Sequence, residues 1–479
     1  MKLLSRCLSV LSDDEMEQIY QAGLRVWARV PMRAQGPEAF MQAARDFGCT
    51  VDGDRISFPE PVRDRVLAAI EERRREHWPP RPVEVNSDHI DKMVSGQALY
   101  CCDLETEQLR PATVADQERF SWVVDAIPGL GRAHPTFIPQ DVPQQCRDLL
   151  TFAIVALNSV HPWRVSVYNA DMIPYFLEVQ AVCQGGSVEQ ARANPVFATK
   201  CWVNTPFMIT RENIEIGMRA REILGQPMHF STMPVAGVAT PVTLAGSLTL
   251  ITAECLALNA LAMALDGRPC GWTAGPLSFD MRTGIHTENS PDVALLRLGS
   301  AQMGAYVFGG EWRAVGGPTT SSKQPDAQAI MDKALDTMWA VCAGVRSFGS
   351  MATLADADIG SLTQLMVDLE LMSYFERLVQ GIAVDEGRLA EDVIAEVAPR
   401  GAYFLNHDHT ARYFREELWL PELVDRRVPM AWAQDPRTMI DNARAKARRL
   451  AATAENQCPL SDEQRRQIRA IMDEAASRC

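Results

Sequence analysis

Residues whose types and spacing suit chemistry gather in three loops between Pro234 and Gln328. The segments read PVAGVATPVTLAG, GWTAGPLSFDMRTG and WRAVGGPTTSSKQPDAQ. In each, a short β-branched or aromatic run ends in Gly, Pro, Ser or Thr, and a long amphipathic segment follows. Small residues and hydroxyls let a backbone approach a ligand closely. We therefore expect these loops to follow strands and to form part of a binding site.

Four polar residues in or near these loops are candidate site residues. Arg282 can clamp a substrate carboxylate through two hydrogen bonds, although an internal pair with Asp280 is the use that we favour. The Ser322 hydroxyl either contacts a ligand or, with Asp326, caps the next helix. Glu254 lies in an apolar segment, where a carboxylate must be paired or protonated. We expect Glu254 to brace a neighbouring strand loop.

Aromatic residues make up 7% of the chain, yet nearly every predicted strand carries one near its end. Three that face a common opening would form a box for a quaternary ammonium cation, with each contact contributing about 0.5–2 kcal/mol. The candidates for this box are Trp163, Tyr168, Trp202, Trp272 and Phe348.

No nucleophile and base stand at a recognisable spacing: the chain has no GxSxG motif and no Ser-His-Asp pattern. We therefore predict no catalytic side chain and expect the site to act by positioning and desolvation. Arg282, His229 and His407 are the candidates for binding a substrate carboxylate. His407, Asp408 and His409 also allow an alternative, a metal-dependent hydrolase or lyase. That alternative lacks a third ligand at a recognisable spacing, and a capped helix start explains the pattern more simply.

The elements that must position these residues alternate between strand and helix. We expect a helix over residues 12–26 with Ser12 as its N-cap, a hairpin around Asp52-Gly53 and a helix over 61–76. Predicted strands then follow at 132–137, 163–169, 201–209, 227–233, 270–275, 312–317 and 345–351. An eighth lies at 97–103 or at 402–405, and the sequence leaves both open.

Strands separated by helices indicate parallel pairing, and seven or eight in series favour a closed barrel. The absence of GxGxxG argues against a dinucleotide-binding sheet. We predict an α/β fold, a TIM-type (β/α)8 barrel over residues 111–405. An N-terminal α+β extension (1–110) and a helical C-terminal segment packed on the barrel (406–479) complete it. Site residues would gather at the rim where the strands end.

Composition limits the partners. Of 479 residues, 47 are Lys or Arg and 61 are Asp or Glu, a formal charge of −14 that argues against nucleic acid. Twelve cysteines form no CxxC motif, which indicates reduced thiols in the cytoplasm. The start of the chain does not resemble a signal peptide. The apolar run from Ser247 to Leu265 contains Glu254 and Asn259, and we expect a core helix rather than a membrane span.

Several segments resemble the trimethylamine:corrinoid methyltransferase family. They are TPVTLAG (240–246), DMRTG (280–284), SKQPDAQ (322–328), LTQLMVDLELM (362–372), LSDDEMEQIY, VDGDRISFPEPV and HTARYFREELWLPEL (409–423). The resemblance spans nearly the whole chain, in order. It implies a TIM-type barrel and methyl transfer from a methylated amine to the cobalt of a separate corrinoid protein, with no tightly bound cofactor.

The founding members of that family carry pyrrolysine, whereas the loop at Thr319–Lys323 has ordinary residues. The chain is thus similar to the branch without pyrrolysine, whose characterised members demethylate quaternary amines such as glycine betaine. A quaternary ammonium departs as a neutral amine, so it needs no electrophilic helper, and an aromatic pocket suits that task. We expect a cytoplasmic homo-oligomer that acts on a betaine with a corrinoid-binding protein as its partner. The alternative is a barrel that binds quaternary amines without turnover.

Overall fold

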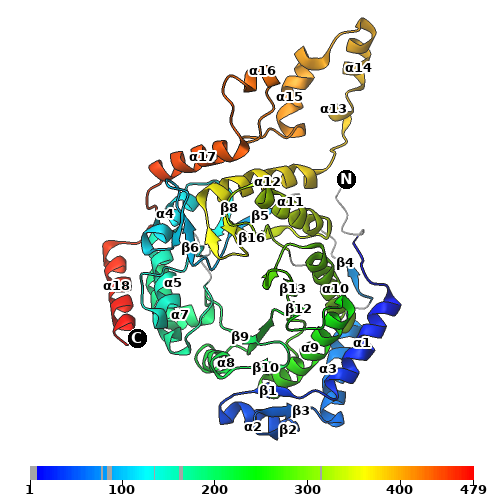
Figure 1. Ribbon diagram of the computed structural model, residues 1–479, viewed down its shortest axis with the longest axis vertical. Helices are drawn as coiled ribbons and strands as arrows, with labels where there is room; N and C mark the ends of the chain where they lie inside the picture. Colours follow the sequence, from blue (N-terminus) through cyan, green and yellow to red (C-terminus); the bar gives the residue numbers. More distant parts are fainter. Residues whose placement is uncertain are drawn as a thin grey trace.

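The computed structural model describes residues 8–76, 79–82, 89–133, 135–160, 165–312 and 316–478. It is a mixed α/β protein in which helices surround short strands (Figure 1). The helices are α1 (Asp13–Trp27), α2 (Glu38–Asp46), α3 (Glu60–Glu76), α4 (Val114–Asp125), α5 (Arg147–Asn158), α6 (Ile173–Gln184), α7 (Val188–Ala193), α8 (Arg211–Leu224), α9 (Leu244–Asp266), α10 (Pro291–Phe308), α11 (Ala327–Cys342), α12 (Leu362–Gln380), α13 (Glu386–Leu389), α14 (Glu391–Val397), α15 (Asp408–Glu417), α16 (Pro429–Trp432), α17 (Met439–Thr453) and α18 (Asp462–Ser477).

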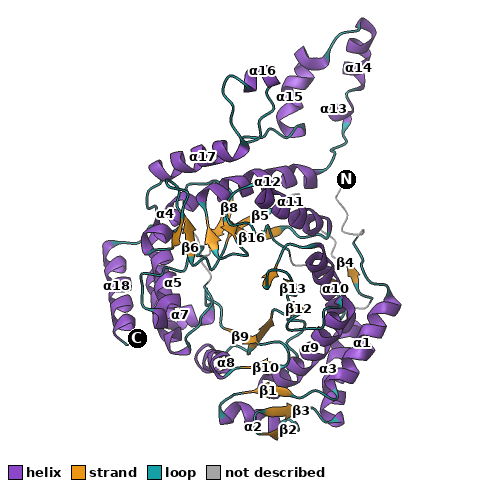
Figure 2. Cartoon of the chain, in the orientation of Figure 1, coloured by secondary structure: helices purple, strands orange, loops and turns teal. Residues whose placement is uncertain are grey.

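The strands are short, and Figure 2 shows them lying inside the helices or at one edge of the body. They are β1 (Met32–Ala34), β2 (Thr50–Asp52), β3 (Arg55–Ser57), β4 (Arg81–Pro82), β5 (Asp91–Val94), β6 (Tyr100–Cys102), β7 (Leu109–Pro111), β8 (Leu130–Ala133), β9 (Lys200–Val203), β10 (Met208–Ile209), β11 (His229–Thr232), β12 (Val235–Ala236), β13 (Leu277–Asp280), β14 (Ile285–Thr287), β15 (Glu311–Trp312), β16 (Ser347–Met351), β17 (Thr353–Leu354) and β18 (Ile359–Gly360).

The predicted N-terminal elements are confirmed. Ser12 caps α1 and forms a capping box with Glu15, and the expected hairpin is β2–β3. Helix α1 packs closely against α9, since a β-carbon on Gly23 would lie 2.8 Å from the Thr252 methyl carbon. A glycine at this position therefore sets the distance between the two helices.

Parallel pairing links strands far apart in the sequence. Strand β5 pairs in parallel with both β8 and β16, and β9 pairs in parallel with β11. Single parallel bridges add Ser166 to Ala198 and Ala274 to Thr232. The segments expected as strands at 163–169 and 270–275 therefore contribute single bridges where they are described.

The two candidates for the eighth strand have different outcomes. Residues 402–405 run into a 3-10 helix, Phe404–Asn406, outside any sheet. Residues 97–103 contain β6, which pairs with β7 and β18, and Ala98 forms a single parallel bridge with Phe137 of the predicted strand at 132–137. Strand β5 lies between β8 and β16, which correspond to the first and the last of the seven predicted strands. Strand β5 was not predicted from the sequence. Its residues DKMV carry two charged side chains, so the segment lacks the apolar run that marks the other strands.

The C-terminal helices differ in how they contact the body. Helix α17 packs against α12 and α4, and α18 packs against α5 and α6. Helices α13 to α16 project from the body beyond α12 (Figure 1). This projecting segment leaves apolar side chains in solvent, among them Tyr403 and Met430, exposed at 90% and 77%.

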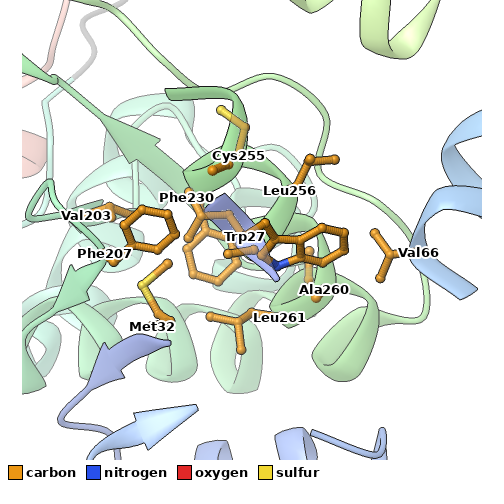
Figure 3. Packing of buried hydrophobic residues seen from close by; sticks show 14 of the residues in the cluster. Trp27, Met32, Val66, Val203, Phe207, Phe230, Cys255, Leu256, Ala260 and Leu261 are labelled. Atoms are coloured by element: carbon orange, nitrogen blue, oxygen red, sulfur yellow. The ribbon is translucent and has the colours of Figure 1, made fainter. Parts of the chain in front are cut away.

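The core beneath α9 is apolar and closely packed. Trp27, Phe207, Phe230 and Leu256 converge there from separate elements (Figure 3). Helix α9 is long and apolar enough to cross a membrane, but 78% of its most apolar window is buried within the protein. That burial agrees with the predicted core helix, because a membrane span would leave its apolar surface outside the protein.

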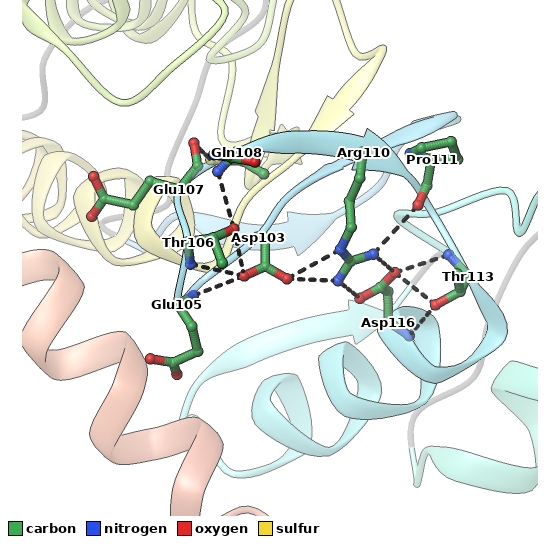
Figure 4. A network of polar contacts seen from close by, with 10 residues as sticks. Asp103, Glu105, Thr106, Glu107, Gln108, Arg110, Pro111, Thr113 and Asp116 are labelled. Carbon is green, nitrogen blue, oxygen red and sulfur yellow. Dashed lines mark hydrogen bonds and ion pairs between the residues drawn. The ribbon is translucent and has the colours of Figure 1, made fainter.

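A polar network joins the β6–β7 hairpin to α4 (Figure 4). The Arg110 guanidinium donates to Asp103 at 2.9 and 3.1 Å and to Asp116 at 2.6 and 2.8 Å. The Asp116 carboxylate also completes the capping box of α4 with Thr113. Hydrogen bonds lower the pKa of Asp103 to about 2. The Thr106 backbone N–H has the largest effect, and the Arg110 guanidinium adds to it. The network fixes the hairpin where β6 pairs with β18.

Candidate functional site

A cavity of about 1810 Å³ lies at the carboxyl ends of the parallel strands. Its wall includes Gln97 after β5, Tyr168 after the bridge at Ser166, and Met233 after β11. The loop after β16 adds Asp356. Parallel strands end at a common edge, so side chains from distant parts of the sequence meet there, as the sequence predicted for the rim. Small-ligand pockets commonly measure about 300–1,000 Å³, so this cavity has room for more than a small amine.

Two predicted aromatic residues form one side of the cavity. Tyr168 is 47% exposed, and its hydroxyl accepts a hydrogen bond of 2.6 Å from Gln97 Nε2. The backbone N–H of Tyr168 donates to the buried Asp148 carboxylate at 2.6 Å, which anchors the loop. Trp202 lies on β9 and also lines the cavity. These rings offer a surface that can bind a cation.

Carboxyl groups also line the cavity. Asp356 receives a hydrogen bond of 2.9 Å from Ser321 Oγ and one of 3.4 Å from Asn289 Nδ2. Its neighbour Glu288 lines the same cavity, and Asp356 Oδ1 accepts the Glu288 backbone N–H at 3.4 Å. Burial raises the pKa of both the Asp356 and the Glu288 carboxyl. Desolvated carboxylates of this kind gain stability when a cation binds beside them.

Glu288 is connected to a second layer of charges behind the wall. Its carboxylate lies 3.3 Å from Arg297, whose guanidinium is 3.8 Å from Asp336. Thr319 Oγ1 donates to Asp336 at 2.9 Å and Thr320 Oγ1 to Asp332 at 2.8 Å. The Thr319 and Thr320 hydroxyls of the GGPTTSSKQPDAQ loop are therefore held by helix α11 rather than directed at a ligand.

The loop that carries Asp356 has an unusual backbone. Five of its non-glycine residues have positive φ: Ser350 (58°), Ala352 (71°), Ala355 (50°), Asp356 (52°) and Ala357 (79°). Each such residue costs about 1–3 kcal/mol and persists only where the surroundings hold it. The Ala355 and Asp356 N–H groups donate to the Ser322 and Thr320 carbonyls, both at 2.8 Å.

A buried ion pair holds the start of that loop. Lys333 Nζ and Asp368 Oδ2 are 2.8 Å apart, and neither side chain is exposed to solvent. The same Asp368 oxygen accepts the Ala352 N–H at 2.7 Å, and Gln364 donates to its other oxygen at 2.8 Å. The pair thus fixes the strained backbone a few residues before Asp356.

One cation on the cavity wall has no ion-pair partner among the described residues. Arg147, at the start of α5, donates to Gln140 Oε1 at 3.2 Å and to the Val142 carbonyl at 3.3 Å, and its Nε is buried without a hydrogen bond. The cavity therefore combines aromatic rings, the desolvated carboxyls of Asp148, Glu288 and Asp356, and a guanidinium with no ion-pair partner among the described residues. That combination suits a small zwitterion or cation.

The three supporting residues act within the protein. Glu254 is fully buried and accepts from Thr205 Oγ1 at 2.7 Å, the Phe207 N–H at 2.7 Å and Thr232 Oγ1 at 3.0 Å, which is the predicted bracing of a strand loop. Burial raises the pKa of Glu254. Asp280 accepts the Arg282 N–H at 2.8 Å. Ser322 donates to Asp326 at 2.9 Å, and Asp326 caps α11.

The two other predicted aromatics that the structure describes lie away from the cavity wall. Trp163 falls outside the described residues. Phe348 is completely buried in the core beside β5, because its side chain faces the helices. Trp272 donates from Nε1 to Ser300 Oγ at 2.9 Å and packs against Gly304 of α10. Of the five predicted aromatics, the structure brings Tyr168 and Trp202 together at the cavity.

The predicted carboxylate-binding residues are also placed elsewhere. Arg282 is 90% exposed and lies 3.5 Å from Asp280. His229 opens β11, at the opposite end of that strand from the cavity. His407 caps α15 by accepting the His409 N–H at 3.0 Å, in the projecting segment. No group of three or more His, Cys, Asp or Glu in the described part of the chain could hold a metal ion, so the hydrolase alternative gains no support from His407 and His409.

Sequence reasoning missed Arg147, Glu288 and Asp356. Asp356 could have been found from the sequence. The segment ATLADADIG follows the predicted strand at 345–351, and residues just after the strands of a barrel lie at the rim where binding sites form. Glu288 follows the second strand of a hairpin, β13–β14, that the sequence did not reveal. Arg147 opens a helix, and nothing in its neighbours distinguishes it from a surface arginine.

Comparison with known proteins identifies similar chains. The family model described as "Trimethylamine methyltransferase (MTTB)" matches residues 3–477. A glycine betaine methyltransferase of Desulfitobacterium hafniense is 26% identical over 449 residues, 93% of this chain and 92% of the relative. A trimethylamine methyltransferase of Methanosarcina thermophila is 24% identical over 450 residues, covering 89% of each chain. The crystal structure of the monomethylamine methyltransferase of Methanosarcina barkeri aligns over 93% of this chain and 89% of its own, with 10% identity and a TM-score of 0.46.

Proposed function

Since the chain belongs to the trimethylamine methyltransferase (MTTB) family, we propose that it moves a methyl group from a quaternary amine to a corrinoid carried by a partner protein. We further propose that its parallel strands belong to one TIM-type barrel with the cavity at its mouth. The cavity, whose wall includes both aromatic rings and desolvated carboxyls, is the observation that carries the proposal. The relative named for glycine betaine supports a quaternary substrate.

The chemistry favours a charged substrate. Breaking the N–CH3 bond of a quaternary ammonium leaves the bonding electron pair on nitrogen and releases a neutral tertiary amine. A reduced Co(I) corrinoid supplies the electron pair that forms the new bond to the methyl carbon. The size of the cavity fits the approach of a large planar group from outside.

The residues of the chain bind and orient the substrate. Tyr168 and Trp202 contact the N-methyl groups, and Asp356 and Glu288 balance the positive charge. Arg147 binds the carboxylate of a betaine, the role first considered for Arg282, His229 and His407. The strained loop at 350–357 holds Asp356 in place before the substrate arrives, so that no reorganisation is needed on binding.

Methyl transfer to free cob(I)alamin tests the proposal directly. The protein is mixed with cob(I)alamin and each of glycine betaine, choline, tetramethylammonium and trimethylamine, and the absorbance of methylated corrinoid is followed. We expect methylation with at least one quaternary amine, together with release of an equal amount of tertiary amine. Binding measured by calorimetry without transfer to cob(I)alamin or to a corrinoid protein would instead indicate a non-catalytic binding protein.

A further inference from the structure

Apolar side chains beside the cavity mouth form an exposed surface on the loops after β11, β12 and β13 and at the start of β14. Met233, Val238, Val242, Met281 and Ile285 are exposed at 44%, 62%, 64%, 60% and 52%. We call these five residues the apolar rim. Solvent-exposed apolar residues are ordinary when scattered, but a contiguous set marks a binding surface.

Contacts place Met281 beside Val242, and the β13–β14 pairing sets Ile285 opposite Asp280, the residue before Met281. A β-carbon on Gly237 would lie 2.5 Å from Met281 Cε and 3.7 Å from Val242 Cγ2, so both side chains border the same glycine. Strands β12 and β13, which carry these loops, pair in parallel. Positive φ at Gly237 (93°) and the close approach of Met281 explain why this position is a glycine.

The rim is continuous with the cavity. Met233 belongs to the rim and also lines the cavity wall, and His286, next to Ile285, lines it as well. On another part of the mouth, Leu99 and Tyr168 line the cavity and are exposed at 38% and 47%. Apolar surface therefore borders the cavity on more than one side.

We propose that the apolar rim is the docking surface for the protein that carries the methyl acceptor, an inference that rests on the proposed function. The acceptor metal must come within bonding distance of a methyl group held inside the cavity, so its carrier must cover the mouth. A cover in that position buries the side chains that border the mouth. Methionine and tyrosine are enriched in protein interfaces, and the flexible Met233 and Met281 adapt to a partner's surface.

The double substitution V242D/M281D tests this surface. Neither residue lines the cavity, so substrate binding and methyl transfer to free cob(I)alamin should stay within twofold of the wild type. The second acceptor is a purified corrinoid protein from a methylamine methyltransferase system, chosen because it accepts methyl groups from the wild type. We expect the KM of V242D/M281D for that protein to be at least tenfold higher than that of the wild type. Leu335→Asp is the matched control, because Leu335 is 63% exposed on α11 and lies outside the cavity wall. It should leave that KM unchanged.

Three outcomes would overturn the inference. If V242D/M281D has the same KM for the corrinoid protein as the wild type, the apolar rim is not the docking surface, and the proposed function is unaffected. If light scattering gives V242D/M281D an assembly mass different from that of the wild type, the rim instead joins copies of this chain. A wild-type protein that neither binds quaternary amines nor transfers a methyl group would overturn the proposed function and this inference together.

Discussion

The Ser321 hydroxyl donates a hydrogen bond of 2.9 Å to the carboxylate of Asp356, and this contact joins two loops that are 35 residues apart in the chain. Asn289 donates to the same two side chains, at 3.2 Å to Ser321 and 3.4 Å to Asp356. Three loops from three successive strand-helix units therefore meet at one carboxylate. Because that carboxylate lines the cavity, its position depends on all three loops.

Asp356→Asn should weaken the binding of a quaternary ammonium. The substitution keeps the shape and an oxygen that accepts from Ser321, but it removes the charge that balances the cation. We expect the Kd for the tetramethylammonium ion, measured by calorimetry, to rise about tenfold, which corresponds to about 1.4 kcal/mol. Asp280→Asn removes an equal charge from a loop outside the cavity wall and serves as the control. Equal Kd values for D356N and the wild type would exclude a role for Asp356 in binding the cation.

The same binding should depend on pH. Burial raises the pKa of Asp356 above 3.8 and that of Glu288 above 4.5, so both carboxyls protonate at a higher pH than exposed ones do. The charged forms bind the cation; the affinity should therefore fall as the pH is lowered through these raised values. Arg297 and His286 beside the pair partly offset the effect of burial on the pKa of Glu288, whereas Asp356 and Asp336 add to it. Calorimetric titrations of tetramethylammonium from pH 8 to pH 4 measure the effect, and D356N should show a smaller slope.

Arg147→Met should distinguish substrates with a carboxylate from those without one. Among the described residues the guanidinium has no ion-pair partner, so its removal leaves none of their carboxylates unpaired. We expect the Kd for glycine betaine to rise at least tenfold, while the Kd for choline changes by less than twofold. Equal losses for both ligands would mean that Arg147 supports the wall rather than binding a carboxylate. Equal affinities in R147M and the wild type would show that Arg147 takes no part in binding.

The sequence predicted elements better than it predicted which side chains meet. Ser12 and the Asp52-Gly53 turn act through neighbouring residues, so local chemistry was sufficient to place α1 and β2–β3. Phe348 shows the limit, because a shift of one residue along a strand moves a side chain from the cavity to the core. Asp356 shows another limit, since its environment is created by Ser321 and Asn289 from distant segments.

Glu254→Gln should change how stability varies with pH. Burial raises the pKa of Glu254 in the folded protein above its unfolded value near 4.5, so the folded state favours the protonated form. The wild type therefore loses stability as the pH rises from about 4.5 to the raised value, and Gln cannot titrate. The free energy of unfolding of the wild type relative to E254Q should accordingly fall over that interval and then stay level. Urea denaturation at a series of pH values measures it, and a constant difference would contradict the prediction.

Replacing the whole side chain at the same position should cost more. Glu254→Ala removes the buried acceptor of the Phe207 N–H and of the Thr205 and Thr232 hydroxyls, and these two hydroxyls, 2.6 Å apart, can then satisfy only one of their two O–H donors in each other. Each unsatisfied donor costs about 1–3 kcal/mol, so E254A should be destabilised by several kcal/mol more than E254Q. Similar stabilities for the two variants would mean that the carboxylate does not brace the loop.

Lys333→Met should destabilise the fold and disturb the cavity at the same time. Removing one member of a buried ion pair leaves an unpaired charge, and we expect a loss of about 3–5 kcal/mol in the free energy of unfolding. Asp368 then draws away from the Ala352 N–H or becomes protonated, which loosens the strained loop that leads to Asp356. The double variant K333M/D368N removes both charges and should recover part of the loss. Arg33 and Asp54 also lie 2.8 Å apart but are 51% and 37% exposed, so Arg33→Met should cost at most about 1 kcal/mol. If K333M and R33M are destabilised equally, the buried pair does not hold the loop, and the proposed link between Asp368 and the cavity fails.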